Sequence, residues 1–124
     1  MAEKRLLVVD DQPALGEIVR RTAEGLDYEV VVTEHAEEFM VEYEKFNPPT
    51  IVLDIVMPDI DGIELVAWLV ERKCGARILV ASGYNNRYAK MAETLGAAKG
   101  LQIKFLEKPF RITELRDALA FVDE

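Results

Sequence analysis

Cysteine, histidine, basic residues and long apolar runs are all scarce in this sequence. With one cysteine, Cys74, and one histidine, His35, neither an internal disulfide nor a metal centre of clustered Cys and His ligands is expected. No signal-peptide pattern and no apolar stretch of membrane-spanning length occurs, so we expect a cytoplasmic protein without membrane contact. The 15 basic residues against 23 acidic ones leave a net charge of −8, which argues against direct binding of nucleic acid.

The composition that remains is that of one folded domain. Half of the 124 residues are hydrophobic, and only five are proline and seven glycine, so disorder is not expected. We find no repeat and no low-complexity segment, and we assign residues 1–124 to a single domain.

Short apolar runs alternate with stretches of helical periodicity. The runs lie at residues 6–9, 30–32, 51–53, 78–80 and, more weakly, 103–106. The helical stretches lie at residues 15–22, 36–43, 63–73, 88–95 and 112–122. Five alternations predict a doubly wound (βα)5 fold of the α/β class, with five parallel strands buried on both faces, the order 2-1-3-4-5, and helices on both sides.

Polar residues follow four of these five strands. Asp10 and Asp11 follow the first strand, Asp54 the third, Ser82 the fourth and Lys108 the fifth. The first and third strands are neighbours in this order, so the three carboxylates are expected within a few ångströms of one another. Two such charges about 4 Å apart cost roughly 4 kcal/mol. A hard divalent cation, Mg²⁺ or Mn²⁺, is therefore expected among these oxygen ligands.

Each residue type in this pocket suits phosphoryl transfer, which requires positioning and neutralisation of charge. Asp54 is the expected nucleophile, Lys108 a second cation, and Ser82 a donor to a phosphate oxygen. Simpler roles exist for each residue alone: Asp11 as the cap of a helix opened by Pro13, Asp54 or Ser82 as a turn residue, and Lys108 as a solvated lysine. Their joint placement favours the pocket.

Four groups of residues in the chain together resemble the receiver domain of bacterial two-component response regulators, over nearly the whole length. The groups are Asp10-Asp11, Asp54 with Met57-Pro58-Asp59-Ile60-Asp61-Gly62 after it, Ser82-Gly83, and Lys108-Pro109-Phe110.

The resemblance implies a flavodoxin-like fold and a phosphorylation reaction. Asp54 would take a phosphoryl group from a sensor histidine kinase or a phosphotransfer protein. Mg²⁺ would be bound by Asp11, Asp54 and the backbone carbonyl of Val56, with Asp10 assisting. Such a protein takes part in its own phosphorylation and dephosphorylation without being a multiple-turnover enzyme.

The resemblance also implies how the signal is passed on. Ser82 would shift toward the phosphate while Phe105 rotates inward. The surface of the fourth helix, fifth strand and fifth helix would change and meet an output domain or a partner protein. Phe105 lacks the hydroxyl of the tyrosine often found there, and residues 95–101 are slightly longer than usual in the family, so the partner surface is expected to be reshaped.

Val56 and Tyr84 occupy positions that vary in the family, and water attacking the acyl phosphate passes them. An apolar and a bulky aromatic side chain there predict slow self-dephosphorylation.

Two other classes of function fit parts of the pattern. A phosphatase of the haloacid dehalogenase type also uses an aspartate nucleophile, Mg²⁺, a hydroxyl and a lysine, but its Asp-x-Asp motif belongs on the first strand, where this chain has Asp10-Asp11. The other class is an interaction module that needs no phosphate and in which the pocket is vestigial.

Overall fold

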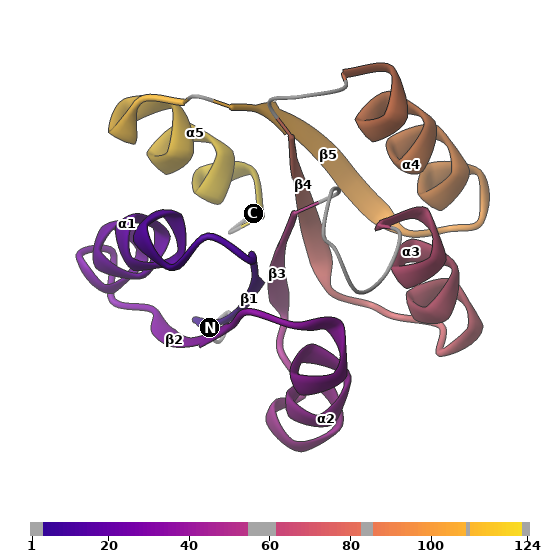
Figure 1. The fold of residues 1–124 in the computed structure, drawn as a ribbon, viewed down its shortest axis with the longest axis horizontal. Helices are drawn as coiled ribbons and strands as arrows, with labels where there is room; N and C mark the ends of the chain where they lie inside the picture. The colour runs from indigo at the N-terminus through magenta and orange to yellow at the C-terminus, as the bar shows by residue number, and fades with distance from the viewer. Residues whose placement is uncertain (1–3, 55–61, 83–85, 109, 123–124) are drawn as a thin grey trace.

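Strand and helix alternate five times in the computed structural model, which describes residues 4–54, 62–82, 86–108 and 110–122 (Figure 1). The strands are β1 (Arg5–Val9), β2 (Glu29–Thr33), β3 (Thr50–Asp54), β4 (Arg77–Ser82) and β5 (Gln102–Glu107). The helices are α1 (Pro13–Glu24), α2 (Ala36–Phe46), α3 (Gly62–Glu71), α4 (Asn86–Ala98) and α5 (Ile112–Val122).

All five strands pair in parallel in the order β2-β1-β3-β4-β5, which confirms the predicted doubly wound fold. Figure 1 shows α1 and α5 on one side of the sheet and α2, α3 and α4 on the other. Because every strand runs in the same direction, all carboxyl ends meet at one edge of the sheet.

Alternate residues of each central strand belong to two separate cores. In β1, Leu7 and Val9 pack in the cluster that includes residues of α2, α3 and α4, whereas Leu6 and Val8 pack in the cluster that includes residues of α1 and α5. All four side chains are fully buried. This double burial explains why the central strands appear in the sequence as continuous apolar runs.

The prediction that all strands are buried on both faces is wrong for β2 and β5. Three residues of β2 are half-buried and Glu29 is exposed, and no residue of β5 is fully buried. Both strands lie at the edges of the sheet, where the covering helices leave part of each strand open.

The third helix ends at Glu71, two residues before the predicted end, because Lys73 adopts a left-handed φ of 52° that a helix cannot continue through.

Three residues of the predicted apolar helix faces are instead exposed. Ile18 of α1 is 44% exposed, Met91 of α4 is 53% exposed and Ile112 of α5 is 52% exposed. In α4 the fully buried Ala92 follows Met91, and one helical residue corresponds to a rotation of about 100°. The small side chain faces the sheet, so the larger neighbour turns toward solvent.

Trp68 and Cys74 lie in the core shared by α2, α3 and α4. The Trp68 ring lies 5.3 Å from the Tyr43 ring, and the Arg72 guanidinium lies 3.6 Å above the indole. Burial is the main cause, and a hydrogen bond with Cys74 the second, of a raised pKa of the Tyr43 phenol.

His35 is an exposed residue that precedes α2 without a side-chain cap. None of the described helices has both the length and the apolar character needed to cross a membrane.

Gly16→Ala is expected to destabilise the protein although alanine is the better helix former. A Cβ atom at Gly16 would lie 2.9 Å from Cγ1 of Val32, so either the Val32 side chain or the spacing of α1 and β2 would have to shift. Overpacking costs about 1–3 kcal/mol against a helix-propensity gain of about 1 kcal/mol. Urea unfolding should show a net loss of about 1 kcal/mol. Gly75→Ala, in the loop between α3 and β4, controls for an added methyl group without a clash, because nothing lies within 4 Å of its Cβ position. Equal stabilities of the two variants would contradict the prediction.

Candidate functional site

The pairing of β1 with β3 places two carboxylates side by side at the carboxyl edge of the sheet. Val9 is in register with Leu53, so Asp10 and Asp54 are the next residues on neighbouring strands. Asp10 is 4% and Asp54 5% exposed, in a part of the sheet whose interior is apolar. Buried carboxylates of this kind require paired charges or a metal ion.

Asp11 completes a three-carboxylate group with Asp10 and Asp54. One oxygen from each of the three lies within 4.8 Å of the others, and Asp11 is the half-buried member. The predicted gathering of these residues is therefore present in the structure.

Lys108 reaches this group from the far edge of the sheet. Its Nζ atom lies 3.0 Å from Oδ2 of Asp10 and 3.4 Å from Oδ1 of Asp54, and its side chain is only 14% exposed. Its backbone N–H donates to the carbonyl of Ser82 at 2.9 Å, which continues the β4–β5 pairing by one residue. The lysine is thus held by its backbone on β4, and its ammonium group crosses to the carboxylates of β1 and β3.

Ser82 ends β4 beside this pocket and is 1% exposed. Its Oγ atom has no hydrogen-bond partner among the residues that the structure describes. An unsatisfied buried hydroxyl is unusual, and beside the Lys108 ammonium it is suited to donating to an anionic oxygen.

Two residues that the sequence analysis missed fix the position of Asp10. The backbone N–H of Gln12 donates to Oδ1 of Asp10 at 2.9 Å. The backbone N–H of Asp10 donates to the carbonyl of Thr33, and the buried Thr33 hydroxyl donates to the carbonyl of Val8 at 2.6 Å. Thr33 also ends a strand, β2, so the strand-end reasoning that identified the other residues was able to find it.

The geometry at the start of α1 does not support Asp11 as a helix cap. Gln12 is the N-cap residue, no side chain caps the helix, and Pro13 occupies the first turn as predicted. The side chain of Asp11 instead belongs to the carboxylate group.

The donor set fits a hard divalent metal ion. Every side chain in the group offers carboxylate oxygen, the ligand that Mg²⁺ and Mn²⁺ favour. The three carboxylates and the Lys108 ammonium carry a formal charge of −2, which one divalent ion balances. When bound, such an ion supplies positive charge to phosphoryl oxygens.

The remaining predicted residues divide between described and undescribed positions. Phe105 lies on β5, half-buried against the core shared with α2, α3 and α4. Val56, Tyr84 and Pro109 lie outside the described residues.

Comparisons with known proteins agree with this geometry. Residues 6–120 match the family model of the response regulator receiver domain. The chain is 28% identical over 116 residues to the chemotaxis protein CheY of Listeria monocytogenes, covering 93% of this chain and 94% of CheY. It is 31% identical over 111 residues to the transcriptional regulatory protein TrcR of Mycobacterium tuberculosis, covering 90% of this chain but only 42% of TrcR.

A solved structure shows the same fold over the full length. The response regulator signal receiver domain from Bermanella marisrubri superposes with a TM-score of 0.85 at 26% identity, covering 99% of this chain and 100% of that one. With the family match, the strand order and the acidic pocket at the strand ends in agreement, the chain belongs to the response regulator receiver domain family.

Proposed function

We propose that this chain is a phosphoacceptor switch in which Asp54 takes a phosphoryl group in a Mg²⁺-dependent reaction. The observation that carries the proposal is the position of Asp54. Its buried carboxylate lies in a group with Asp10 and Asp11, and Lys108 Nζ lies 3.4 Å from its Oδ1. Asp54 alone of the three carboxylates ends a strand in the middle of the sheet, between the acidic pair and Lys108.

The proposed donor is the phosphohistidine of a sensor histidine kinase or a phosphotransfer protein. The phosphorus–nitrogen bond breaks, its electron pair stays on the imidazole, and a carboxylate oxygen of Asp54 forms the new phosphorus–oxygen bond. Asp11, Asp54 and the Val56 carbonyl would hold the metal ion with help from Asp10. The Lys108 ammonium neutralises charge on the transferred group, and the Ser82 hydroxyl donates to one of its oxygens.

The proposed readout runs through Ser82 and Phe105. Ser82 lies in register with Glu107 on β5, and Phe105 precedes Glu107 by two residues on the same strand. A shift of Ser82 toward the phosphate would therefore be transmitted to the paired residues of β5. The phosphoryl group acts by favouring one of two existing arrangements, since a ligand shifts an equilibrium only through its differential affinity.

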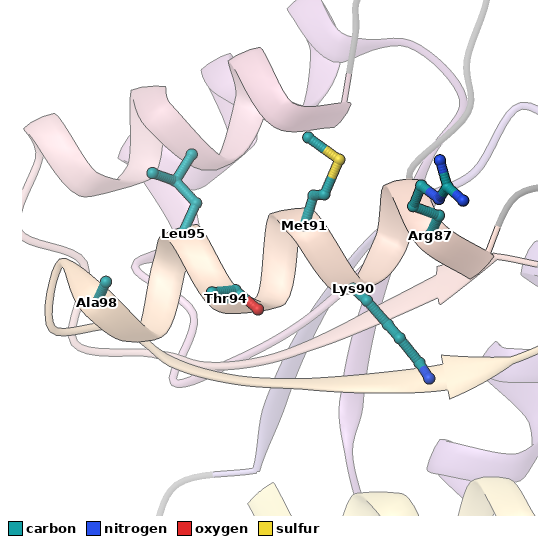
Figure 2. A pocket seen from close by; sticks show the side chains of 6 residues that line it. All are labelled: Arg87, Lys90, Met91, Thr94, Leu95 and Ala98. Carbon is teal, nitrogen blue, oxygen red and sulfur yellow. The ribbon is translucent and has the colours of Figure 1, made fainter.

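The surface of α4, β5 and α5 is the proposed meeting point with an output domain or a partner protein. A groove of about 800 Å³ runs along α4, lined by Arg87, Lys90, Met91, Leu95 and other α4 residues. Figure 2 shows the Met91 and Leu95 side chains leaving the helix on one side and Lys90 on the other. The exposed Met91 and the two basic residues suit a partner with apolar and acidic side chains.

The test is incubation of the wild type with a small phosphodonor, with and without Mg²⁺, followed by intact mass spectrometry. We expect one phosphoryl adduct per chain that depends on Mg²⁺ and maps to Asp54. Multiple-turnover hydrolysis of phosphate monoesters would favour the phosphatase class instead, and absence of any adduct would favour the phosphate-independent interaction module.

A Val56→Asn, Tyr84→Glu double variant is expected to lose its phosphoryl group faster than the wild type. Polar side chains at these two positions would admit and orient water, whereas valine and tyrosine hinder it. We expect the half-life of the adduct to fall by about tenfold, equivalent to about 1.4 kcal/mol in the barrier. Adduct decay followed by mass spectrometry gives both half-lives, and equal values would remove the hypothesis of slow self-dephosphorylation.

A further inference from the structure

A side chain of α4 bonds to the backbone of β5 at the proposed switch residue. The Phe105 N–H donates to Oε2 of Glu93 at 2.8 Å, and the bond is partly buried. Twelve residues separate the two in sequence. The acceptor is a carboxylate, so this hydrogen bond belongs to the stronger, charge-assisted class.

The contact closes part of an open sheet edge. β5 pairs only with β4, and its other side is the outer edge of the sheet. On an edge strand alternate N–H groups point away from the sheet and have no strand partner. Glu93 occupies the position that the carbonyl of a further strand would take opposite Phe105.

A second contact fixes the same helix to the same strand. The buried Gly96 packs so closely that a Cβ atom there would lie 3.1 Å from Cδ1 of Ile103 and 3.3 Å from Cδ1 of Leu101. Gly96 is about one helical turn beyond Glu93, and Ile103 is two residues before Phe105. Helix and strand are thus joined at two successive points, one apolar and one polar.

We propose that Glu93 is a positioning residue that couples α4 to β5, so that a rearrangement at Phe105 and a movement of α4 occur together. The signalling role of this contact rests on the proposed function, because Glu93 would then link the phosphorylated Asp54 pocket to the α4 surface. The polar link is made by the backbone N–H of Phe105 and not by its side chain.

Hydrogen–deuterium exchange on the unphosphorylated protein tests the link itself. We expect the Phe105 amide to exchange about tenfold faster in Glu93→Ala, because its acceptor is gone. Glu93→Gln keeps a carbonyl acceptor and should stay close to the wild type. Glu37→Ala removes an exposed helical glutamate as the charge-matched control. Unchanged exchange at Phe105 in Glu93→Ala would overturn the inference. If Glu93→Ala folds poorly, Glu93→Met, of similar size but without an acceptor, replaces it.

The same exchange measurement on the phosphorylated proteins tests the coupling. Glu93→Ala leaves the Asp54 pocket untouched, so it should accept one phosphoryl group as the wild type does. We expect phosphorylation to change exchange in residues 90–98 of the wild type and of Glu93→Gln, and this change to be lost in Glu93→Ala. An equal change in all three proteins would overturn the coupling. Failure of the wild type to form an adduct would remove the phosphoacceptor proposal, and the unphosphorylated comparison would then decide the role of Glu93.

Discussion

Asp54→Asn is expected to form no phosphoryl adduct under conditions in which the wild type is converted to a singly phosphorylated chain. The substitution keeps the size and planarity of the side chain but replaces the nucleophilic oxygen with an amide. Asp10 and Asp11 remain, and Lys108 keeps its shorter contact, 3.0 Å to Asp10. The loss should therefore arise from the missing nucleophile and not from collapse of the pocket.

A matched substitution outside the pocket controls for the change of aspartate to asparagine. Asp27 lies on the surface with a φ of 71°, in the left-handed region that asparagine tolerates well. Asp27→Asn should be phosphorylated like the wild type. An adduct of equal size on Asp54→Asn would show that another residue accepts the phosphoryl group, and the central proposal would then be wrong.

Lys108→Ala is expected to lower the free energy of unfolding by about 3–5 kcal/mol in the absence of divalent metal. The substitution removes the ammonium group that lies 3.0 Å from Asp10 and 3.4 Å from Asp54, and both carboxylates are about 95% buried. They would remain next to each other and to Asp11 without that positive charge. Urea unfolding with a metal chelator present measures the loss.

Added Mg²⁺ should restore part of the stability of Lys108→Ala, because an ion that binds only the folded state stabilises it by mass action. Lys99→Ala is the control, since Lys99 is exposed at the end of α4 and surface substitutions of this kind change stability by about 0.5 kcal/mol or less. If the free energy of unfolding of Lys108→Ala lies within about 1 kcal/mol of the wild-type value, the lysine contributes little to holding the carboxylates together.

The sequence predicts the pocket well because the fold class determines which positions come together. In a parallel sheet every strand ends at the same edge, so Asp10, Asp54, Ser82 and Lys108 can be grouped once the strands are found. The distances between these side chains and the identity of their hydrogen-bond partners could be obtained only from the structure. The 3.0 Å contact of Lys108 with Asp10 depends on how far the side chain reaches past the ends of β4 and β3, which strand order alone does not determine.

Contacts made by backbone groups and by helix rotation were not predictable in the same way. The strand-end position of Thr33 could be predicted, but the hydrogen bond from the Asp10 N–H to the Thr33 carbonyl is a backbone contact that does not depend on residue type. The sequence does not distinguish Glu93 from other helical glutamates, because its contact with Phe105 depends on the distance between α4 and β5. Ile18 and Met91 fit the apolar period, yet the neighbouring Val19 and Ala92 are the buried residues, and Ile18 and Met91 are exposed.

The ends of the pocket lie 98 residues apart in the chain, at Asp10 and Lys108. During synthesis the acidic residues of β1 and β3 therefore emerge long before the lysine that neutralises them, and domains emerge from the ribosome in order from the N-terminus. A nascent chain that ends before β5 would have to gather three like charges without Lys108, which disfavours early closure of the sheet. Chains truncated before residue 108 are therefore expected to depend more on a divalent ion to close the sheet, and to be degraded faster without it, than the full chain.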